Sequence, residues 1–208
     1  YWPKIIVLTN IEEDHLDYYR DLNHIMETFG KYISHLGGDG ALVANADDKN
    51  ITEILKNSNV IARSPALREG RGRRGNPVDG GKRTGLLRFA RNDKAFGKLK
   101  KVLKVPGEHN VLNALAAMAV ARLLNISDEV SMKTLNNFTG TWRRMEYKGE
   151  INGAKIYDDY GHHPTEIRAT LSGARELLTK NYKLKTKNQL WCVFQPHQYQ
   201  RTYQLFDQ

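Results

Sequence analysis

The stretch Tyr157-Asp158-Asp159-Tyr160-Gly161-His162-His163-Pro164-Thr165-Glu166 decides the fold class of this 208-residue chain. It brings together two carboxylates, two imidazoles and a proline that can start a helix, directly after the strand-like Ala154-Lys155-Ile156. A strand that ends in acids and histidines and then turns into a helix is typical of the carboxyl edge of a parallel α/β sheet, where such folds bind nucleotides. A polar surface turn is the alternative interpretation, and the histidines and the Pro-Thr-Glu helix start count against it.

The rest of the chain alternates between strand and helix patterns. In the first part we expect strands at 5–8, 41–44 and 59–62 and helices at 21–34 and 51–55. In the second part we expect helices at 111–124, 128–136 and 165–178 and strands at 146–151, 154–158 and 190–194. The helix at 111–124 is apolar nearly all round, which predicts that it is buried. The alternation in the first part predicts a parallel sheet with crossover helices.

A basic segment interrupts this pattern. Residues 63–101 hold 13 Lys and Arg against 3 acidic residues, so they account for the whole net charge of +9. Because residues 63–94 are rich in glycine and arginine and lack a sustained period, we expect them to be a disordered insert. Within the insert, Gly81-Lys82 has the wrong neighbours for a phosphate-binding loop, because Asn76 replaces the required glycine and Arg83 the required Ser or Thr.

Composition favours a reducing compartment. The single cysteine, Cys192, cannot form an internal disulfide, and its apolar neighbours predict that it is buried in a strand. No apolar run reaches the length of a membrane span and the chain does not open with a signal peptide, so we expect a cytoplasmic protein that does not enter the membrane. Because the chain opens on Tyr1 within a strand pattern and stops at Gln208 as a new segment begins, we expect a fragment of a longer protein.

Four separated motifs need one explanation. They are Thr9-Asn10-Ile11-Glu12-Glu13-Asp14-His15-Leu16-Asp17, Gly107-Glu108-His109-Asn110-Val111-Leu112-Asn113-Ala114, the Asp158–Glu166 run, and Phe194-Gln195-Pro196-His197-Gln198-Tyr199-Gln200-Arg201-Thr202. In this order they resemble the Mur ligases of bacterial cell-wall synthesis over nearly the whole chain except the basic insert. The resemblance implies an α/β fold: a partial central ATP-binding domain at 1–139, with a parallel sheet and flanking helices, and the start of a Rossmann-like C-terminal domain at 140–208.

The resemblance also implies a reaction. The last two motifs are most similar to those of the family member that joins L-alanine to the lactyl carboxylate of UDP-N-acetylmuramate through an acyl phosphate. That activity requires ATP and Mg²⁺. A sister ligase that recycles whole peptides onto the same sugar is the first alternative. A nucleic-acid-binding protein that uses residues 63–101 is the second; only Phe89 and Phe96 there could stack on bases, and we expect no specific nucleic-acid partner. We expect the 208-residue piece alone to be inactive, because it contains no Gly-Lys-Thr phosphate loop.

Site residues in the first two motifs follow from the resemblance. His15 is similar to a histidine that binds the second Mg²⁺ and takes part in catalysis, although Mg²⁺ prefers oxygen ligands; a loop histidine that caps the next helix is the alternative. His109, Asn110 and Asn113 are similar to the residues that bind adenine. Asn110 and Asn113 lie one helical turn apart, and an amide offers the donor and acceptor that the adenine edge requires. Asn113 as a buried cap is the alternative.

The later motifs supply the remaining candidates. Arg143 or Arg144 is similar to an arginine that contacts the nucleotide phosphates, with ordinary surface arginines as the alternative. Asp159 is similar to the acid that binds the ribose hydroxyls, and His162 to the phosphate-side histidine, which we count as catalytic.

Arg201, also counted as catalytic, is similar with His197 to the contact for the substrate carboxylate or the alanine. An arginine offers a bidentate fork to a carboxylate. Some relatives have a second arginine where this chain has Gln198, which leaves the amino-acid specificity open.

Overall fold

The first half of the chain is built around a three-stranded parallel sheet whose middle strand is short and buried. The structure is a computed structural model that describes residues 1–37, 39–57, 85–91, 93–181 and 189–208. Three parallel strands, β1 (Ile5–Leu8), β2 (Ala41–Asn45) and β3 (Gly85–Phe89), form a sheet in the order β1-β2-β3. Every residue of β2 is buried, as is typical of a central strand with both faces covered.

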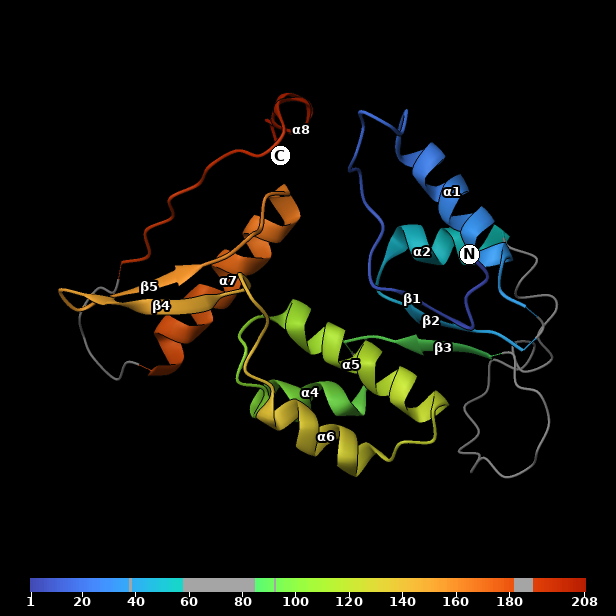
Figure 1. The fold of residues 1–208 in the computed structure, drawn as a ribbon, viewed down its shortest axis with the longest axis horizontal. Helices are drawn as coiled ribbons and strands as arrows, with labels where there is room; N and C mark the ends of the chain where they lie inside the picture. Colours follow the sequence, from blue (N-terminus) through green and yellow to red (C-terminus); the bar gives the residue numbers. More distant parts are fainter. Residues whose placement is uncertain (38, 58–84, 92, 182–188) are drawn as a thin grey trace.

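Helices cover both faces of this sheet (Figure 1). On one face α1 (Leu22–Ser34) and α2 (Lys49–Asn57) pack around Leu42 and Ala44. On the other face Val43 packs with α4 (Lys94–Val102), α5 (Glu108–Leu123) and α6 (Asp128–Asn137). Successive side chains of a strand point to opposite faces, so β2 feeds both cores. The parallel sheet with flanking helices that the sequence predicts is confirmed.

The helix limits follow local signals in the sequence. Asp21 caps α1 by accepting a hydrogen bond from the His24 N–H at 2.8 Å, and Ser127 caps α6 by accepting from Val130 N–H. Both are residue types that satisfy the free N–H groups at a helix start. The predicted helices at 21–34, 51–55, 111–124 and 128–136 therefore agree with the observed ones to within three residues at either end. Among the described residues, no helix has the length and apolar character that crossing a bilayer requires.

The second half contains a hairpin and two helices. β4 (Glu146–Ile151) and β5 (Ala154–Asp158) pair antiparallel, and Asn152 and Gly153 between them have φ values of 50° and 82°. Asn and Gly tolerate this left-handed backbone, which a two-residue hairpin turn needs. The helices are α7 (Pro164–Asn181) and α8 (Tyr199–Gln204), and the sequence analysis missed α8. The strand before Asp159 thus ends a hairpin, which corrects the expectation that it belongs to a parallel sheet edge.

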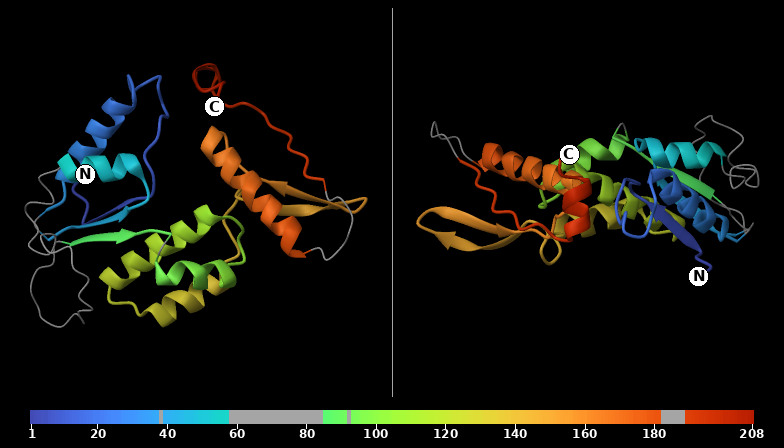
Figure 2. Two further views of the ribbon diagram at one scale, coloured as in Figure 1. Left: turned by 180° about the vertical axis from the view of Figure 1, so that it is seen from behind. Right: turned by 90° about the horizontal axis from the view of Figure 1, so that it is seen from above.

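The two halves meet where α7 crosses the start of α5, as the two views in Figure 2 show. A Cβ placed on Gly173 of α7 would lie 3.3 Å from both the Cα and the N of Gly107. A side chain at residue 173 would therefore require the backbone of Gly107 to shift by a few tenths of an ångström, which favours glycine at this close approach. The contact sets α7, and the turn that precedes it, beside the amino-terminal end of α5.

The predicted disordered insert at 63–94 is wrong for its last part. Residues 85–89 form β3 beside β2, residue 94 begins α4, and Phe89 is only 2% exposed. A buried parallel strand appears in sequence as a short apolar run without alternation, so its arginine-rich surroundings concealed it. The sequence also gave no expectation of α4. The predicted strand at 59–62 and the rest of the insert up to residue 84 lie outside the described residues.

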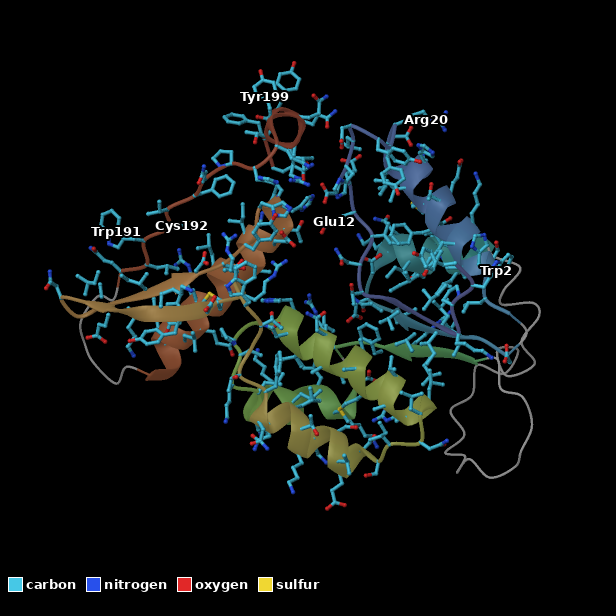
Figure 3. All side chains as sticks on the ribbon, viewed as in Figure 1. Trp2, Glu12, Arg20, Trp191, Cys192 and Tyr199 are labelled. Atoms are coloured by element: carbon cyan, nitrogen blue, oxygen red, sulfur yellow. The ribbon has the colours of Figure 1, made fainter. Side chains whose placement is uncertain are left out.

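The expected strand at 190–194 is also not observed. Residues 189–198 have no regular secondary structure, and Trp191 and Val193 are 83% and 100% exposed. Cys192 is exposed rather than buried. Figure 3 shows Trp191 and Cys192 on an extended segment that leads toward α8. A strand requires hydrogen-bonded neighbours, and within the described chain this segment has no strand partner.

The placement of Phe89 in the core gives a test of β3. Replacing Phe89 by Ala should lower the free energy of unfolding by about 3–5 kcal/mol, because a large buried side chain leaves a cavity. Urea unfolding followed by circular dichroism would measure this. The matched control is Arg88→Ala, since Arg88 is exposed on the same strand; it should change stability by less than about 0.5 kcal/mol. Equal effects of the two substitutions would contradict the assignment.

Candidate functional site

The loop after β1 presents three acidic residues at the carboxyl edge of the parallel sheet. Asn45 donates a hydrogen bond to the Thr9 carbonyl at 2.9 Å, and Asn50 donates to the Ile11 carbonyl at 2.6 Å. These two bonds anchor the start of the loop to β2 and α2. The segment Glu12-Glu13-Asp14, here called the acidic loop, therefore has a fixed base. Figure 3 shows Glu12 on the side of the loop that faces α7 and α8.

His15 follows the acidic loop in a left-handed backbone conformation, with φ of 52°. Its N–H donates to the Asp14 carboxylate at 2.8 Å, and its ring lies 3.8 Å from the same carboxylate. The side chain is 57% exposed. The Tyr18 and Tyr19 N–H groups both donate to the His15 carbonyl, which stabilises the turn. His15 is thus available to a ligand while Asp14 holds its backbone.

The start of α5 positions the three residues expected at adenine. Asn110 donates from its side-chain amide to the Pro106 carbonyl at 2.7 Å, and its N–H donates to the Gly107 carbonyl. Asn113 is exposed, so the alternative of a buried cap does not apply. His109 is half-buried beside Gly107. The helix start is therefore rigid, with Asn113 exposed one turn further on.

One carboxylate holds together the loop before β4 and the turn after β5. Asp159 accepts hydrogen bonds from the Met145 N–H at 2.9 Å and from the Gly161 N–H at 2.7 Å. Met145 and Arg143 both have left-handed backbones, with φ of 48° and 52°. The Tyr160 N–H donates to the Arg143 carbonyl at 2.8 Å, which ties the same two segments a second time. These bonds stabilise a loop conformation that non-glycine residues rarely adopt.

The two candidate arginines face different groups. The Arg143 guanidinium pairs with Asp158 at 3.0 Å and lies 4.9 Å from the centre of the Tyr160 ring. Arg144 lies 4.0 Å from Asp159 and 3.6 Å from Glu166. Arg143 is thus engaged with the hairpin end and Arg144 with the turn before α7.

The N-terminus of α7 is organised by Glu166. Its carboxylate accepts the N–H groups of His162 and His163, at 3.1 and 3.4 Å. Burial raises the pKa of Glu166, but these two N–H groups and the charges of Arg144 and His162 outweigh it, and the pKa lies below its usual value. An ionised Glu166 in the first turn also suits the helix dipole.

His109 links the two halves of the candidate site electrostatically. Burial lowers the pKa of His109, the Asp159 carboxylate raises it, and the Arg144 guanidinium lowers it, with a net shift below the usual value. The interaction places the α5 residue within electrostatic reach of both residues from the second half. The structure therefore brings His109, Arg144 and Asp159 into one neighbourhood.

A second group forms where α8 meets the acidic loop. The Arg201 guanidinium is nearly buried and pairs with Asp14, with its Nη2 and Nε at 2.8 and 2.9 Å from Oδ1. Burial raises the pKa of Asp14. The hydrogen bond from the His15 N–H and the hydrogen bond and charge of Arg201 outweigh this effect, so the pKa lies below its ordinary value of 3.8. Arg201 also donates to the His197 carbonyl at 3.2 Å. His15 and Arg201 thus meet through a shared aspartate.

An aromatic contact connects these groups. The His162 ring centre lies 5.1 Å from that of Tyr160 and 5.7 Å from that of His197. The structure therefore places His197 beside His162, and Arg201 beside His15. It does not bring Asn113 into contact with either group through any interaction described for the chain. A pocket lies between α4, α5 and α7, with Lys104, Pro106 and Leu177 among its lining residues, and none of the candidate residues lines it.

The expectation that Asp14 orients the loop around His15 agrees with its hydrogen bond from the His15 N–H. Sequence reasoning missed three other residues that organise this site. Asp158, His163 and Glu166 each make an ion pair or hydrogen bond that fixes a candidate residue or joins the two halves. All three lie inside the motifs quoted from the sequence. Their position next to the candidate residues in the same motifs could have indicated a supporting role. Only the fold shows which carboxylate faces which arginine.

Comparison with known proteins gives consistent matches. Residues 1–121 match the family model named Mur ligase middle domain, and residues 143–208 match that named Mur ligase, glutamate ligase domain. UDP-N-acetylmuramate–L-alanine ligase from Clostridium tetani is 44% identical over 207 residues, and that from Clostridium acetobutylicum 42%. Each alignment covers 100% of this chain and 43% of the relative. The chain thus spans less than half the length of the curated relatives it matches.

Solved structures share the fold. The crystal structure of MurF from Acinetobacter baumannii superposes with a TM-score of 0.59 at 19% identity, covering 87% of this chain and 38% of that one. UDP-N-acetylmuramate-alanine ligase MurC from Thermotoga maritima gives a TM-score of 0.57 at 22% identity, covering 86% and 40%. At these identities the likeness concerns the fold alone.

The Asp14–Arg201 pair predicts a pH-dependent contribution to stability. Because the pKa of folded Asp14 is lowered, its contribution is present above the ordinary value of 3.8 and is lost as the pH falls through the folded pKa. Asp14→Asn should cost about 1–3 kcal/mol near neutral pH, and this deficit should shrink below pH 3.8. Urea unfolding from pH 7 to pH 3 would show it. Asp17→Asn, on the exposed part of the same loop, is the control, and a deficit that does not change with pH would refute the interpretation.

The neighbourhood of His109 predicts opposite effects of two substitutions on its pKa. Asp159→Asn removes a negative charge and should lower the pKa of His109 further, whereas Arg144→Gln removes a positive charge and should raise it. Titration of the His109 ring by NMR would measure both. Glu150→Gln, at an exposed hairpin position, should leave the pKa unchanged. If neither charge substitution moves the titration, His109 is not close to these residues in solution.

Proposed function

This chain belongs to the Mur ligase family, and from that premise we propose that it forms part of a UDP-N-acetylmuramate–L-alanine ligase. Members of this family form amide bonds in an ATP-dependent reaction. The names of the relatives at 44% and 42% identity support the alanine-adding member. Because the chain spans 43% of those relatives, we propose the activity for the whole protein and not for these 208 residues alone.

The observation that carries the proposal is the neighbourhood of His109, Arg144 and Asp159. A half-buried imidazole, an exposed guanidinium and a carboxylate from two halves of the chain form a mixed polar site at the start of α5. A nucleotide needs groups of this kind for its base, phosphates and ribose. The residues thus fit ATP. Between the two arginines, we propose that Arg144 contacts phosphate, because Arg143 makes a close pair with Asp158 at 3.0 Å and stacks over Tyr160. The acidic neighbours of Arg144 are further away, at 3.6 and 4.0 Å.

The proposed reaction has two steps. A carboxylate oxygen of the lactyl group attacks the γ-phosphorus of ATP, the bond to ADP breaks, and an acyl phosphate forms. The alanine amine then attacks the acyl carbon, phosphate leaves with the electron pair of the broken bond, and the amine loses a proton. Such transfers depend on positioning and on fixed positive charge near the transferring oxygens. Arg144 and His162 are the groups that we propose on the phosphate side, and His15 on the substrate side.

For Mg²⁺ the fit is partial. Among the described residues no three His, Cys, Asp or Glu side chains gather in a way that could hold a metal ion. Mg²⁺ is commonly bound by one or two protein groups together with phosphate oxygens and water. His15 is exposed enough to be such a group, and the Asp14 carboxylate is already committed to Arg201. Bound Mg²⁺ would neutralise charge on the transferring phosphoryl group.

Arg201 has a competitor for the substrate carboxylate. Its guanidinium is occupied by Asp14 in this structure, and the residue is only 7% exposed. We propose that a substrate carboxylate binds Arg201 in exchange for, or beside, Asp14.

We also propose that the domain boundary lies near Gly140, after α6, in the stretch between the two matched family models. We also propose a cytoplasmic location, where a chain with a single cysteine needs no disulfide.

The nucleic-acid alternative loses its support at the level of side chains. Of the two aromatic residues that could stack on bases, Phe89 is 2% exposed and Phe96 packs against the core around α5. Stacking on single-stranded nucleic acid requires exposed rings. Lys94, Lys98 and Lys101 of α4 are exposed, and residues 63–84 of the basic segment lie outside the described residues. The peptide-recycling alternative is tested by the amino-acid substrate, as follows.

A chimera tests the proposed activity. Residues of this chain should replace the corresponding 207 residues of the Clostridium tetani ligase, which supplies the remaining parts. We expect release of phosphate from ATP that depends on both UDP-N-acetylmuramate and L-alanine. Arg144→Gln in the chimera should reduce the rate by about 10²–10³-fold, the usual effect of removing a group that stabilises transition-state charge, and Arg175→Gln on α7 serves as the matched control.

The chimera and the isolated chain give separate outcomes. A chimera that folds but uses a peptide in place of L-alanine would support the recycling ligase, and one without substrate-dependent phosphate release would refute the proposal. The isolated 208 residues should release no phosphate, because they contain no phosphate-binding loop motif.

A further inference from the structure

A buried histidine joins the two halves of the chain at the candidate site. His163 is 4% exposed and lies one residue before α7. Its ring Nε2 is 2.8 Å from the carbonyl oxygen of Glu13, which lies 150 residues earlier in the acidic loop. A carbonyl oxygen can only accept a hydrogen bond, so Nε2 carries the proton and donates.

The second ring nitrogen has a different partner. The Thr165 N–H, in the first turn of α7, points at Nδ1 of His163 at 3.3 Å, so Nδ1 accepts. The two contacts together select the neutral tautomer with the proton on Nε2. The Glu12 carboxylate lies 3.7 Å from Nδ1, and Glu166 accepts the backbone N–H of His163. The ring is therefore oriented from both sides, by α7 and by the acidic loop.

This contact connects the two parts of the chain that hold the phosphate-side and substrate-side histidines. The acidic loop is anchored to the sheet at its base and leads directly into His15. His162 is the neighbour of His163, and its N–H is held by the same Glu166 carboxylate. The Asp14–Arg201 pair is a second tie between the loop and the second half, through α8. The hydrogen bond from His163 is the tie that acts directly on the start of α7.

We propose that His163 is a positioning residue for the ligase reaction: its Nε2–H holds the acidic loop against the start of α7 and so sets His15 relative to His162. The inference rests on the proposed function. His163 is buried and contacts protein groups on both ring nitrogens, so it acts through its neighbours. A misplacement of about 1 Å among reacting groups can cost about 100-fold in rate.

Two substitutions separate the two hydrogen bonds of the ring. Glutamine places an amide N–H at the position of Nε2 and can still donate to the Glu13 carbonyl. Asparagine reaches only as far as Nδ1, so it can accept from Thr165 N–H but cannot span to Glu13. We expect His163→Gln in the chimera to keep kcat within about threefold of the unsubstituted enzyme, and His163→Asn to lower kcat about 10–100-fold with a smaller effect on KM for ATP. Equal losses for both would overturn the proposal.

Two measurements on the 208-residue chain do not depend on activity. Nitrogen-15 NMR of the imidazoles should show His163 as the neutral tautomer with the proton on Nε2. Deuterium uptake by residues 10–17 should rise in His163→Asn and stay unchanged in His163→Gln. The other tautomer, or uptake that does not differ between the variants, would overturn the proposal even with an active chimera. If the unsubstituted chimera is inactive, the proposed function fails, and these two results still decide whether His163 holds the loop.

Discussion

The carboxylate of Asp159 is the constraint on which the second half of the candidate site depends. It accepts two backbone N–H groups, from Met145 and Gly161, and so closes the loop before β4 onto the turn after β5. Left-handed backbones at Arg143 and Met145 would otherwise be costly, and charge-assisted hydrogen bonds to backbone N–H groups are among the stronger ones in proteins. Asp159 therefore fixes the backbone conformation of the loop that carries both Arg143 and Arg144.

Burial distinguishes the ion pairs that contribute to stability from those that contribute little. Pairs such as Lys4–Asp39 and Lys56–Glu53 join exposed side chains and contribute little to stability. Arg201 is nearly buried, so its pairing with Asp14 compensates a charge that would be expensive to leave alone. The two halves thus meet through charged and polar groups at α8 and at the start of α7, and through a close backbone approach of Gly107 and Gly173 at α5.

Sequence patterns were sufficient for the helices and for the two strands that carry their own signals. Asp21 and Ser127 mark helix starts, and the apolar runs before residues 9 and 46 mark β1 and β2. Sequence patterns were insufficient for β3, because only its position beside β2 distinguishes Leu86-Leu87 from a loop. They also failed for residues 190–194, which have a strand-like sequence but no strand partner in the described chain. Candidate site residues were recognisable by resemblance. Their supporting partners were not, because Glu13 and His163 lie 150 residues apart.

The glycine contact between α5 and α7 has a mechanical consequence. A Cβ at residue 173 would lie 3.3 Å from backbone atoms of Gly107, which is tighter than ordinary van der Waals contact, so a larger side chain there would push α7 away from the start of α5. The turn that carries Asp159 would move with α7, away from His109. The two glycines therefore set the spacing between the residues that we assign to the nucleotide.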